Sequence, residues 1–287
     1  MNSIKAKRVR ISDMILYGLI YLCVGISVLL IAGIILYVFG KGFSQINWEF
    51  LTTTTSVLKG TVGIAGNILN TVYIIVLTML LATPIGVGAA IYLNEYAKPG
   101  RLVKWIELAT ETLSGIPSII FGMFGMVFFG TTLGLKYSIL TGTLTLTLMV
   151  LPLITRNTQE ALKTVPDSYR HGAVGLGAGK WYTIRTILLP SAMPGIITGV
   201  ILAIGRIVGE SAALLYTAGS SNLLPQSAKM YLDKILQPGG TLTIQLYLSA
   251  QDGEFDIAFG IALVLLVIVL VINMATKFVV KSCNRSV

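Results

Sequence analysis

The first long apolar stretch of this chain limits what it can fold into more than any other feature. Residues 14–39 form a run of 26 residues without a charged side chain. At about 1.5 Å per residue, a helix of this length crosses the roughly 30 Å hydrocarbon core of a membrane. The apolar core of a secretory signal peptide is shorter, about 7–15 residues, so the run predicts an uncleaved membrane span. The whole chain agrees, because 54% of its 287 residues are hydrophobic, 11% are charged and its mean hydropathy is +0.82.

Five further stretches of this kind predict an all-α integral membrane protein with six transmembrane helices. The expected spans are residues 14–39, 68–93, 112–130, 138–155, 187–218 and 257–276, within one domain at 14–280 and between tails at 1–13 and 281–287. Pro84 is expected to kink the second span, whereas Pro190 and Pro194 lie near the start of the fifth, where proline is tolerated. Residues 41–67 are interpreted as an external loop or short re-entrant piece, and 219–256 as the longest external polar connection.

Lys and Arg are unevenly distributed between the two sides that these spans define. With the N-terminus inside the cell, residues 1–13, 94–111, 156–186 and 277–287 hold 15 of the 21 basic residues, and the outside segments hold 5. Cytoplasmic segments carry such an excess, so both ends and residues 156–186 are predicted to be cytoplasmic. Because the basic residues flank apolar spans, the net charge of +9 does not indicate a nucleic-acid partner.

The residues that usually build an enzyme or metal site are scarce. One histidine and two distant cysteines, Cys23 and Cys283, cannot supply the usual ligands of a zinc site, and they predict no disulfide framework. Residues 175–180 resemble a phosphate-binding loop only in part. Val174 stands where its first glycine belongs, and Trp181 follows Lys180 where Ser or Thr should bind magnesium. We therefore expect no catalysis, no metal and no nucleotide in this chain.

Residues 166–190 form a polar, glycine-rich stretch between two apolar runs on the predicted cytoplasmic side. A short helix is expected to start at Pro166, with Asp167 or Ser168 in its first turn. The glycines that follow would break it, and Trp181–Tyr182 suit the membrane interface where the next helix enters. The stretch is therefore either a docking element for a soluble partner or a plain solvated loop, and the first interpretation fits its pattern better.

The same stretch resembles the cytoplasmic loop of ATP-binding-cassette importer permeases. That loop reads Glu-Ala-Ala, three residues, Gly, nine residues, Ile, one residue, Leu-Pro. Four anchors match at the required spacing, together with the second alanine: Gly177, Ile187, Leu189, Pro190 and Ala173. The first two positions depart, since His171 replaces the usual Glu and Gly172 the first Ala.

Further segments along most of the chain are similar to one subfamily, the phosphate-importer permeases. They are Tyr92-Leu-Asn-Glu-Tyr96, Gly115-Ile-Pro-Ser118 with Phe121-Gly122, Leu151-Pro152, Glu160-Ala-Leu162 with Val165-Pro166, and Gly205-Arg-Ile-Val-Gly-Glu210. The continuation Ser211-Ala-Ala-Leu-Leu resembles the PstA-type subunit more than its PstC-type partner.

The resemblance implies a type I importer permease fold in a prokaryotic cell membrane, surrounded by membrane lipid and forming half of the pathway for inorganic phosphate. The implied partners are a PstC-type permease, a dimeric PstB-type ATPase and an extracytoplasmic phosphate-binding protein. ATP and magnesium are expected to bind to the ATPase and not to this chain. The implied ATPase-coupling loop lies within residues 156–186 and its continuation, and comprises Arg170, His171, Gly172, Ala173, Gly177, Ile187, Leu189 and Pro190.

Arg206 and Glu210 are the charges expected inside the fifth span. At a span centre each costs about 2.5–3.5 kcal/mol, so idle charges are not expected there. Four residues apart, they are predicted to share one helix face. They form either a neutralising pair that locks the bundle or a substrate pathway, in which Arg206 binds a phosphate oxyanion and Glu210 holds the arginine in its absence.

Several alternatives stay open. The substrate could be another oxyanion, such as molybdate or sulfate. A stand-alone channel or carrier would need no docking loop, and no inverted repeat is evident; a membrane regulator would not need Arg206 and Glu210. His171 is either a tolerated surface replacement or the basis of a pH-dependent dock. Gly115 and Pro117 are either a hinge, part of the substrate path or, as we prefer, determinants of helix packing.

Overall fold

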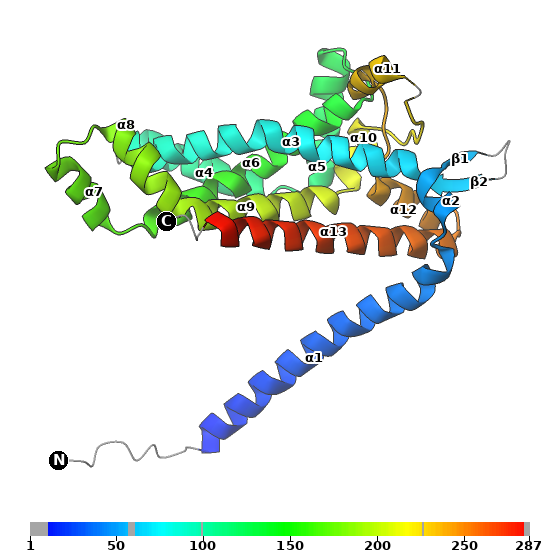
Figure 1. Cartoon of the computed structure of the whole chain (residues 1–287), viewed down its shortest axis with the longest axis horizontal. Coiled ribbons are helices and arrows are strands. Elements are labelled where there is room, and N and C mark those ends of the chain that lie inside the picture. The colour runs from blue at the N-terminus through cyan, green and yellow to red at the C-terminus, as the bar shows by residue number, and fades with distance from the viewer. Residues whose placement is uncertain (1–10, 57–60, 99, 226, 284–287) are drawn as a thin grey trace.

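A computed structural model describes residues 11–56, 61–98, 100–225 and 227–283 (Figure 1). The outermost parts of both expected tails, residues 1–10 and 284–287, lie outside the described residues, as do the basic side chains expected there. Within the described part the chain is almost entirely helical, as predicted. Five helical stretches are long and apolar enough to cross a membrane, and a sixth crossing results if one sharply bent pair counts as a single span.

Four long helices run side by side along the axis of the bundle: α3 (Ala65–Ile91), α6 (Ile139–Lys163), α9 (Leu189–Val208) and α13 (Phe255–Cys283). They confirm the second, fourth and sixth spans, although α6 and α13 extend beyond the expected bounds. Pro84 lies inside α3 and Pro152 inside α6. Ser138 precedes α6 as its N-cap, and its side chain accepts a hydrogen bond from the Thr141 amide.

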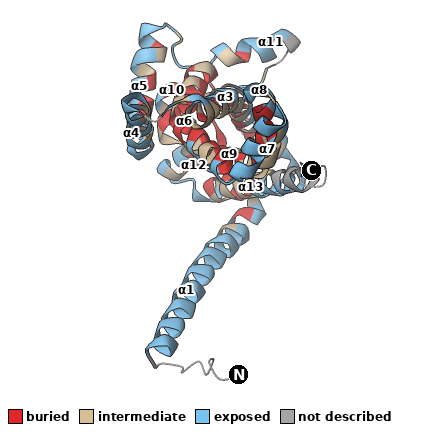
Figure 2. Cartoon of the chain, turned by 90° about the vertical axis from the view of Figure 1, so that its left-hand side faces the viewer, coloured by how far each residue is buried: buried red, intermediate tan, exposed pale blue. Residues whose placement is uncertain are grey.

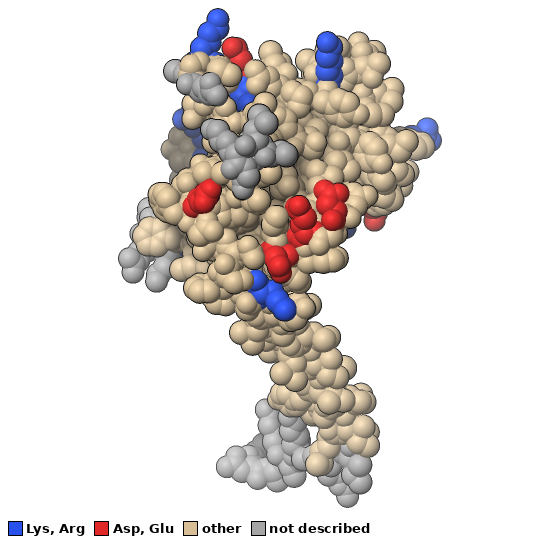
Figure 3. Space-filling model, turned by 90° about the vertical axis from the view of Figure 1, so that its right-hand side faces the viewer, with Lys and Arg blue, Asp and Glu red and all other residues tan. Residues whose placement is uncertain are grey.

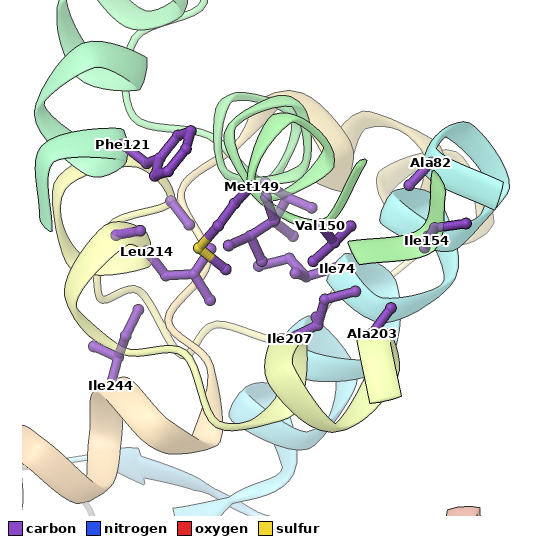
Figure 4. Packing of buried hydrophobic residues seen from close by; sticks show 14 residues of the cluster. Ile74, Ala82, Phe121, Met149, Val150, Ile154, Ala203, Ile207, Leu214 and Ile244 are labelled. Atoms are coloured by element: carbon purple, nitrogen blue, oxygen red, sulfur yellow. The ribbon is translucent and has the colours of Figure 1, made fainter. Parts of the chain in front are cut away.

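The core lies where these helices meet α10 (Ala212–Thr217) and α12 (Leu242–Gln251). Figure 4 shows Met149 and Val150 of α6 packed among Ile74, Ile207 and Leu214 from the surrounding helices. Viewed along the bundle axis, the buried residues gather at the centre (Figure 2). Helices α3 and α6 therefore share a closely packed interface along the bundle.

The first helix, α1 (Ile11–Gly42), stands apart from the bundle, as Figures 1 and 2 show. It confirms the first span. It meets α13 near its C-terminal end, where the Tyr37 ring packs edge-on against Phe259 with centroids 5.5 Å apart. Its apolar side chains are exposed in the isolated chain. In a bilayer such a surface contacts acyl chains without a hydrophobic penalty.

Residues 43–64 contain more structure than the expected loop. They form the turns η1 (Phe43–Gln45) and α2 (Trp48–Thr52) and an antiparallel hairpin of β1 (Thr54–Ser56) and β2 (Thr61–Ile64). Phe50 and Ile64 from this segment are buried against Leu242 and Ile261. The segment therefore closes the predicted external end of the bundle, rather than passing loosely over it.

The third span is not the single helix predicted at residues 112–130. Helix α4 (Arg101–Gly115) ends just before Ile116. The next helix, α5 (Ser118–Gly125), continues as the π-helix η3 (Met126–Thr132), and the two helical pieces are bent by 101° relative to each other. The residue before a proline is disfavoured in helical conformation, and Ile116 before Pro117 is extended, with φ −72° and ψ 131°. Pro117 therefore breaks the helix. The glycines act as expected: Gly122 and Gly125 bring α5 directly onto Ala213 and Thr145.

The fifth span also differs from its prediction. A continuous helical stretch runs from Lys180 to Val208. It consists of α8 (Lys180–Thr183), the π-helix η4 (Ile184–Leu188) and α9. It starts earlier than expected, so Pro190 and Pro194 lie inside a helical rod rather than at its start. It also ends earlier, because residues 209–211 separate α9 from the short helix α10.

The long external connection at 219–256 folds inward and forms α11 (Ala228–Asp233), η5 (Lys234–Leu236) and α12. The side-chain amides of Asn67 and Asn70, at the start of α3, both donate to the Gly240 carbonyl, and Asn70 also donates to that of Ser221. These hydrogen bonds hold Ser221 and Gly240, near the two ends of this connection, against α3. We call residues 219–241 the external segment.

Lys234 anchors the same segment from within. Its ammonium donates to the carbonyls of Leu223 at 2.9 Å and Pro238 at 3.4 Å, and no carboxylate among the described residues pairs with it. Burial lowers the pKa of Lys234 below its ordinary value. Asp252, Glu254 and Asp256 are exposed on the turn into α13 at the same end of the bundle, and Figure 3 shows acidic groups gathered on this face.

The lowered pKa of Lys234 predicts how the stability of the external segment changes with pH. Between the folded and the ordinary pKa the unfolded segment binds more protons than the folded one, so folding becomes more favourable as pH rises. We expect proteolytic cleavage within residues 219–241 to slow on going from pH 7 to pH 9.5. The trend should disappear in Lys234→Met, and cleavage that accelerates with pH in the unsubstituted chain would contradict the assignment.

Candidate functional site

The predicted cytoplasmic helix is present as α7 (Asp167–Gly175), at the same end of the bundle as the start of α1 and the end of α13 (Figure 1). Pro166 precedes it and Asp167 lies in its first turn, as expected. Gly177 has a φ of +79°, which an L-residue with a side chain rarely adopts, and the amides of Gly177 and Ala178 donate to the carbonyls of Val174 and Ala173. The glycine in the matched loop is therefore required by the backbone that ends this helix.

Helix α7, the turn after it and the short helix α8 carry exposed apolar side chains. They are Tyr169, Val174, Leu176, Trp181 and Tyr182, which we call the α7 apolar face. Leu176 is 91% exposed, although a side chain of this kind is normally covered in a soluble environment. An exposed apolar cluster on a short, capped helix is typical of a surface that binds a partner.

The expected loop residues separate into exposed and packed groups. His171 and Gly172 are exposed, whereas Ala173 is buried. Ile187, Leu189 and Pro190 belong to the following helical rod, where Leu189 packs against a buried cluster of Leu162, Val165, Ile184, Leu188 and neighbouring side chains. Ile187, Leu189 and Pro190 therefore belong to the rod that follows α7, and Leu176, which sequence reasoning did not select, is exposed.

Arg170 is the most highly bonded side chain of this end. Its guanidinium donates to four oxygens at 2.9–3.0 Å: the carboxylates of Glu95 and Asp167 and the backbone carbonyls of Leu162 and Val165. The hydrogen bond to Glu95 is the main cause that raises the pKa of Arg170 above its ordinary value. Sequence reasoning included Arg170 but missed Glu95. A partner 75 positions away leaves no local signal, although Glu95 lies in a segment similar to phosphate-importer permeases.

Arg206 and Glu210 do not share one helix face, so that part of the prediction is wrong. Arg206 lies in the last turn of α9 and is half-buried, whereas Glu210 follows the end of the helix and is buried. The Glu210 carboxylate accepts a hydrogen bond from the Ala213 amide at 3.1 Å and so caps α10. Arg206 forms no ion pair or hydrogen bond with another described residue. Each charge complements the dipole of its own helix end.

The two interpretations of His171, a tolerated surface replacement and a pH-dependent dock, lead to a direct test. Its side chain is exposed on α7, and no hydrogen bond or ion pair joins it to another described residue. We expect His171→Glu, which restores the usual residue of such loops, to leave the pH profile of coupled ATP hydrolysis between pH 6 and 8 unchanged. A profile that flattens in the variant would instead identify His171 as a pH-dependent contact, because histidine ordinarily titrates in this range.

Comparison with known proteins places these elements in a family context. Residues 82–287 match the family model described as "Binding-protein-dependent transport system inner membrane component". The chain is 36% identical to the "Probable ABC transporter permease protein YqgI" of Bacillus subtilis (strain 168) over 282 residues, which are 94% of this chain and 95% of that protein. It is 31% identical to the "Phosphate transport system permease protein PstA 2" of Mycobacterium bovis over 268 residues, which are 93% and 88% of the two chains.

A solved structure shares the architecture. The fold superposes on a chain of a bacterial alginate ABC transporter, crystallised with its alginate-bound periplasmic protein, with a TM-score of 0.67 over 94% of this chain and 96% of that one. Only 17% of the aligned residues are identical, so this likeness describes the fold alone.

Proposed function

The chain belongs to the family of binding-protein-dependent transport system inner membrane components, and from this premise we propose that it is a PstA-type permease subunit of an ATP-driven phosphate importer. The family makes the chain a multi-pass membrane component that works with an ATPase and a substrate-binding protein. The specific proposal is phosphate as the substrate, a PstC-type chain as the second permease, a dimeric PstB-type ATPase and an extracytoplasmic phosphate-binding protein.

The observation that carries the phosphate proposal is the unpaired guanidinium of Arg206. It lies half-buried near the end of a helix in an apolar bundle, and within the described residues no carboxylate neutralises it. A guanidinium offers a planar fork of donors that matches an oxyanion, and an anion is the partner that such a site lacks. The named phosphate permeases among the relatives support the same substrate.

Glu210 has a different part in this proposal from the one first assigned to it. Its carboxylate is engaged with the Ala213 amide, and its backbone carbonyl accepts a hydrogen bond from Thr243 of α12 at 2.8 Å. These two hydrogen bonds therefore fix the backbone between α9 and α10, four residues after Arg206 in the sequence. Phosphate would contact Arg206, and Glu210 would position the backbone around it.

The α7 apolar face is the proposed contact with the ATPase. ATP binding would draw the two ATPase subunits together, move α7 with them and so alternate the pathway between inward-facing and outward-facing states. ATP and magnesium would be bound by that partner, and the loop at 175–180 of this chain departs from the phosphate-loop pattern.

Reconstitution tests the proposal directly. The complete importer is reconstituted in vesicles, with ATP on the side of the membrane that carries the ATPase. These vesicles are expected to accumulate radiolabelled phosphate only when the binding protein is present. Excess molybdate and sulfate serve as competitors. Uptake that is unaffected by both supports phosphate, whereas accumulation of molybdate or sulfate with exclusion of phosphate would overturn the substrate and keep the transporter class.

A further inference from the structure

The cytoplasmic end of α3 is held by two cations from the loop that contains α7. Helix α3 continues into a short π-helix, η2 (Tyr92–Tyr96). Glu95 in this π-helix accepts a hydrogen bond from Arg170 of α7 at 2.9 Å, and the Lys180 ammonium at the start of α8 lies 4.7 Å from the centre of the Tyr96 ring. We call these four residues the α3–α7 joint. It joins segments that are far apart in the sequence.

The central contact of the joint has the geometry of a strong one. The Glu95 side chain is only 9% exposed and that of Arg170 22%, so water screens this pair far less than an exposed one. Asn94 donates a further hydrogen bond to the same Glu95 oxygen at 2.7 Å and holds the carboxylate in place. By contrast, the Asp167 carboxylate that also accepts from Arg170 is 82% exposed. Of the two ion pairs, the one with α3 is therefore the stronger.

The opposite end of α3 is fixed to the external segment. Together with η2, the helix spans 32 residues, or about 48 Å at 1.5 Å per residue. Its first turns carry Asn67 and Asn70, whose amides hold the Gly240 and Ser221 carbonyls. Helix α3 is hydrogen-bonded along its length except where Pro84 lacks an amide donor, so we expect displacement at the joint to reach the external segment.

We propose that Glu95 and Arg170 are positioning residues that transmit the movement of α7 to α3, and through α3 to the external segment. The inference rests on the proposed function, since it assumes that a partner ATPase moves α7. It adds a route: the coupling helix acts on α3 directly across the joint, and not only through α6 and α9, to which it is joined along the chain.

A purely structural role for Arg170 is the competing explanation. Two of its four hydrogen bonds go to the carbonyls of Leu162, at the C-terminal end of α6, and of Val165, two residues beyond that end. Glu95→Ala separates the two roles, because it removes the contact with α3 and leaves both carbonyl contacts of Arg170 intact. Glu95→Gln keeps an acceptor but removes the charge, so it should show an intermediate effect.

The test measures movement of α3 in the complete importer. Spin labels at Val72 of α3 and Phe255 of α13, both exposed positions, report the distance between these helices at the external end, after Cys23 and Cys283 are replaced by Ser. We expect trapping of the ATPase with ATP and vanadate, which leaves ADP and vanadate bound, to shift this distance in the reference protein and in Glu160→Ala. Glu160 is the matched control, because its ion pair with Arg156 at 3.6 Å is exposed and lies outside the joint.

In Glu95→Ala the shift should be lost, substrate uptake per ATP should fall by about tenfold, and the ATPase should still co-purify. A full shift in Glu95→Ala would overturn the inference. So would loss of the ATPase from Glu95→Ala combined with an unchanged shift in Glu95→Gln. The label distance does not depend on the substrate, so failure of phosphate uptake in the reference protein would reject the phosphate proposal and leave this result readable.

Discussion

Arg206→Gln is expected to abolish phosphate uptake by the reconstituted importer, while the chain still inserts in the membrane and binds its ATPase. Charge-assisted hydrogen bonds contribute about 1.5–3 kcal/mol each. Loss of two such bonds from a guanidinium to phosphate corresponds to at least about 3 kcal/mol, or roughly a 100-fold reduction in uptake. Arg206 contacts no other described residue through its charge, so the folded bundle should tolerate the change.

Two further variants identify the cause of such a loss. Arg206→Lys keeps the positive charge without the planar fork and should retain only a small part of the uptake. Arg101→Gln makes the same change at an exposed position at the start of α4 and should transport normally. If Arg206→Gln took up phosphate at the reference rate, Arg206 would have no role in the pathway and the substrate proposal would lose its main support.

Leu176→Asp is expected to release the ATPase from the permease. Leu176 is 91% exposed, so the substitution removes almost no contact within the chain. Burial of a leucine side chain against a partner is worth about 1.5–3 kcal/mol, and an unpaired carboxylate in its place adds a desolvation cost. The affinity for the ATPase should therefore fall by roughly 100-fold, as measured by co-purification and by titration of the solubilised permease.

A matched change on the opposite face serves as the control. Leu223 is 68% exposed in the external segment, and Leu223→Asp should leave the ATPase bound. Normal co-purification of Leu176→Asp would show that the α7 apolar face is not the contact surface. Phosphate uptake should fall in parallel with ATPase binding in Leu176→Asp, whereas Arg206→Gln should lose uptake alone. This difference separates the coupling end of the molecule from the pathway.

Local signals predicted the elements whose formation depends on adjacent residues. Uncharged runs predicted most of the long helices, because charge is costly within a membrane span, although the third run belongs to a bent pair and the fifth expected span carries Arg206. Pro166 and Gly177 bounded α7 correctly because each acts through its own backbone angles. The excess of Lys and Arg indicated which end is cytoplasmic, and α7 lies at the same end as the start of α1 and the end of α13.

Where helices end was less predictable. The bend at Pro117 followed from a rule that acts on the preceding residue, but the apolar composition of the span concealed it. The end of α9 at Val208 separated Arg206 from Glu210, and the Ala213 amide then became the partner of Glu210. A four-residue spacing brings two side chains together only if the helix continues through both.

The amino-acid sequence by itself predicted the class of the protein, most of its long helices, the side on which its basic residues gather and the loop that resembles those of importer permeases. Only the tertiary structure paired Glu95 with Arg170 and Asn67 with Gly240, and turned the polar external connection into a packed segment. The physical reason is range. Hydrophobicity and backbone preference act on each residue where it stands, whereas a contact between residues 75 or 173 positions apart forms only when packing brings their helices together.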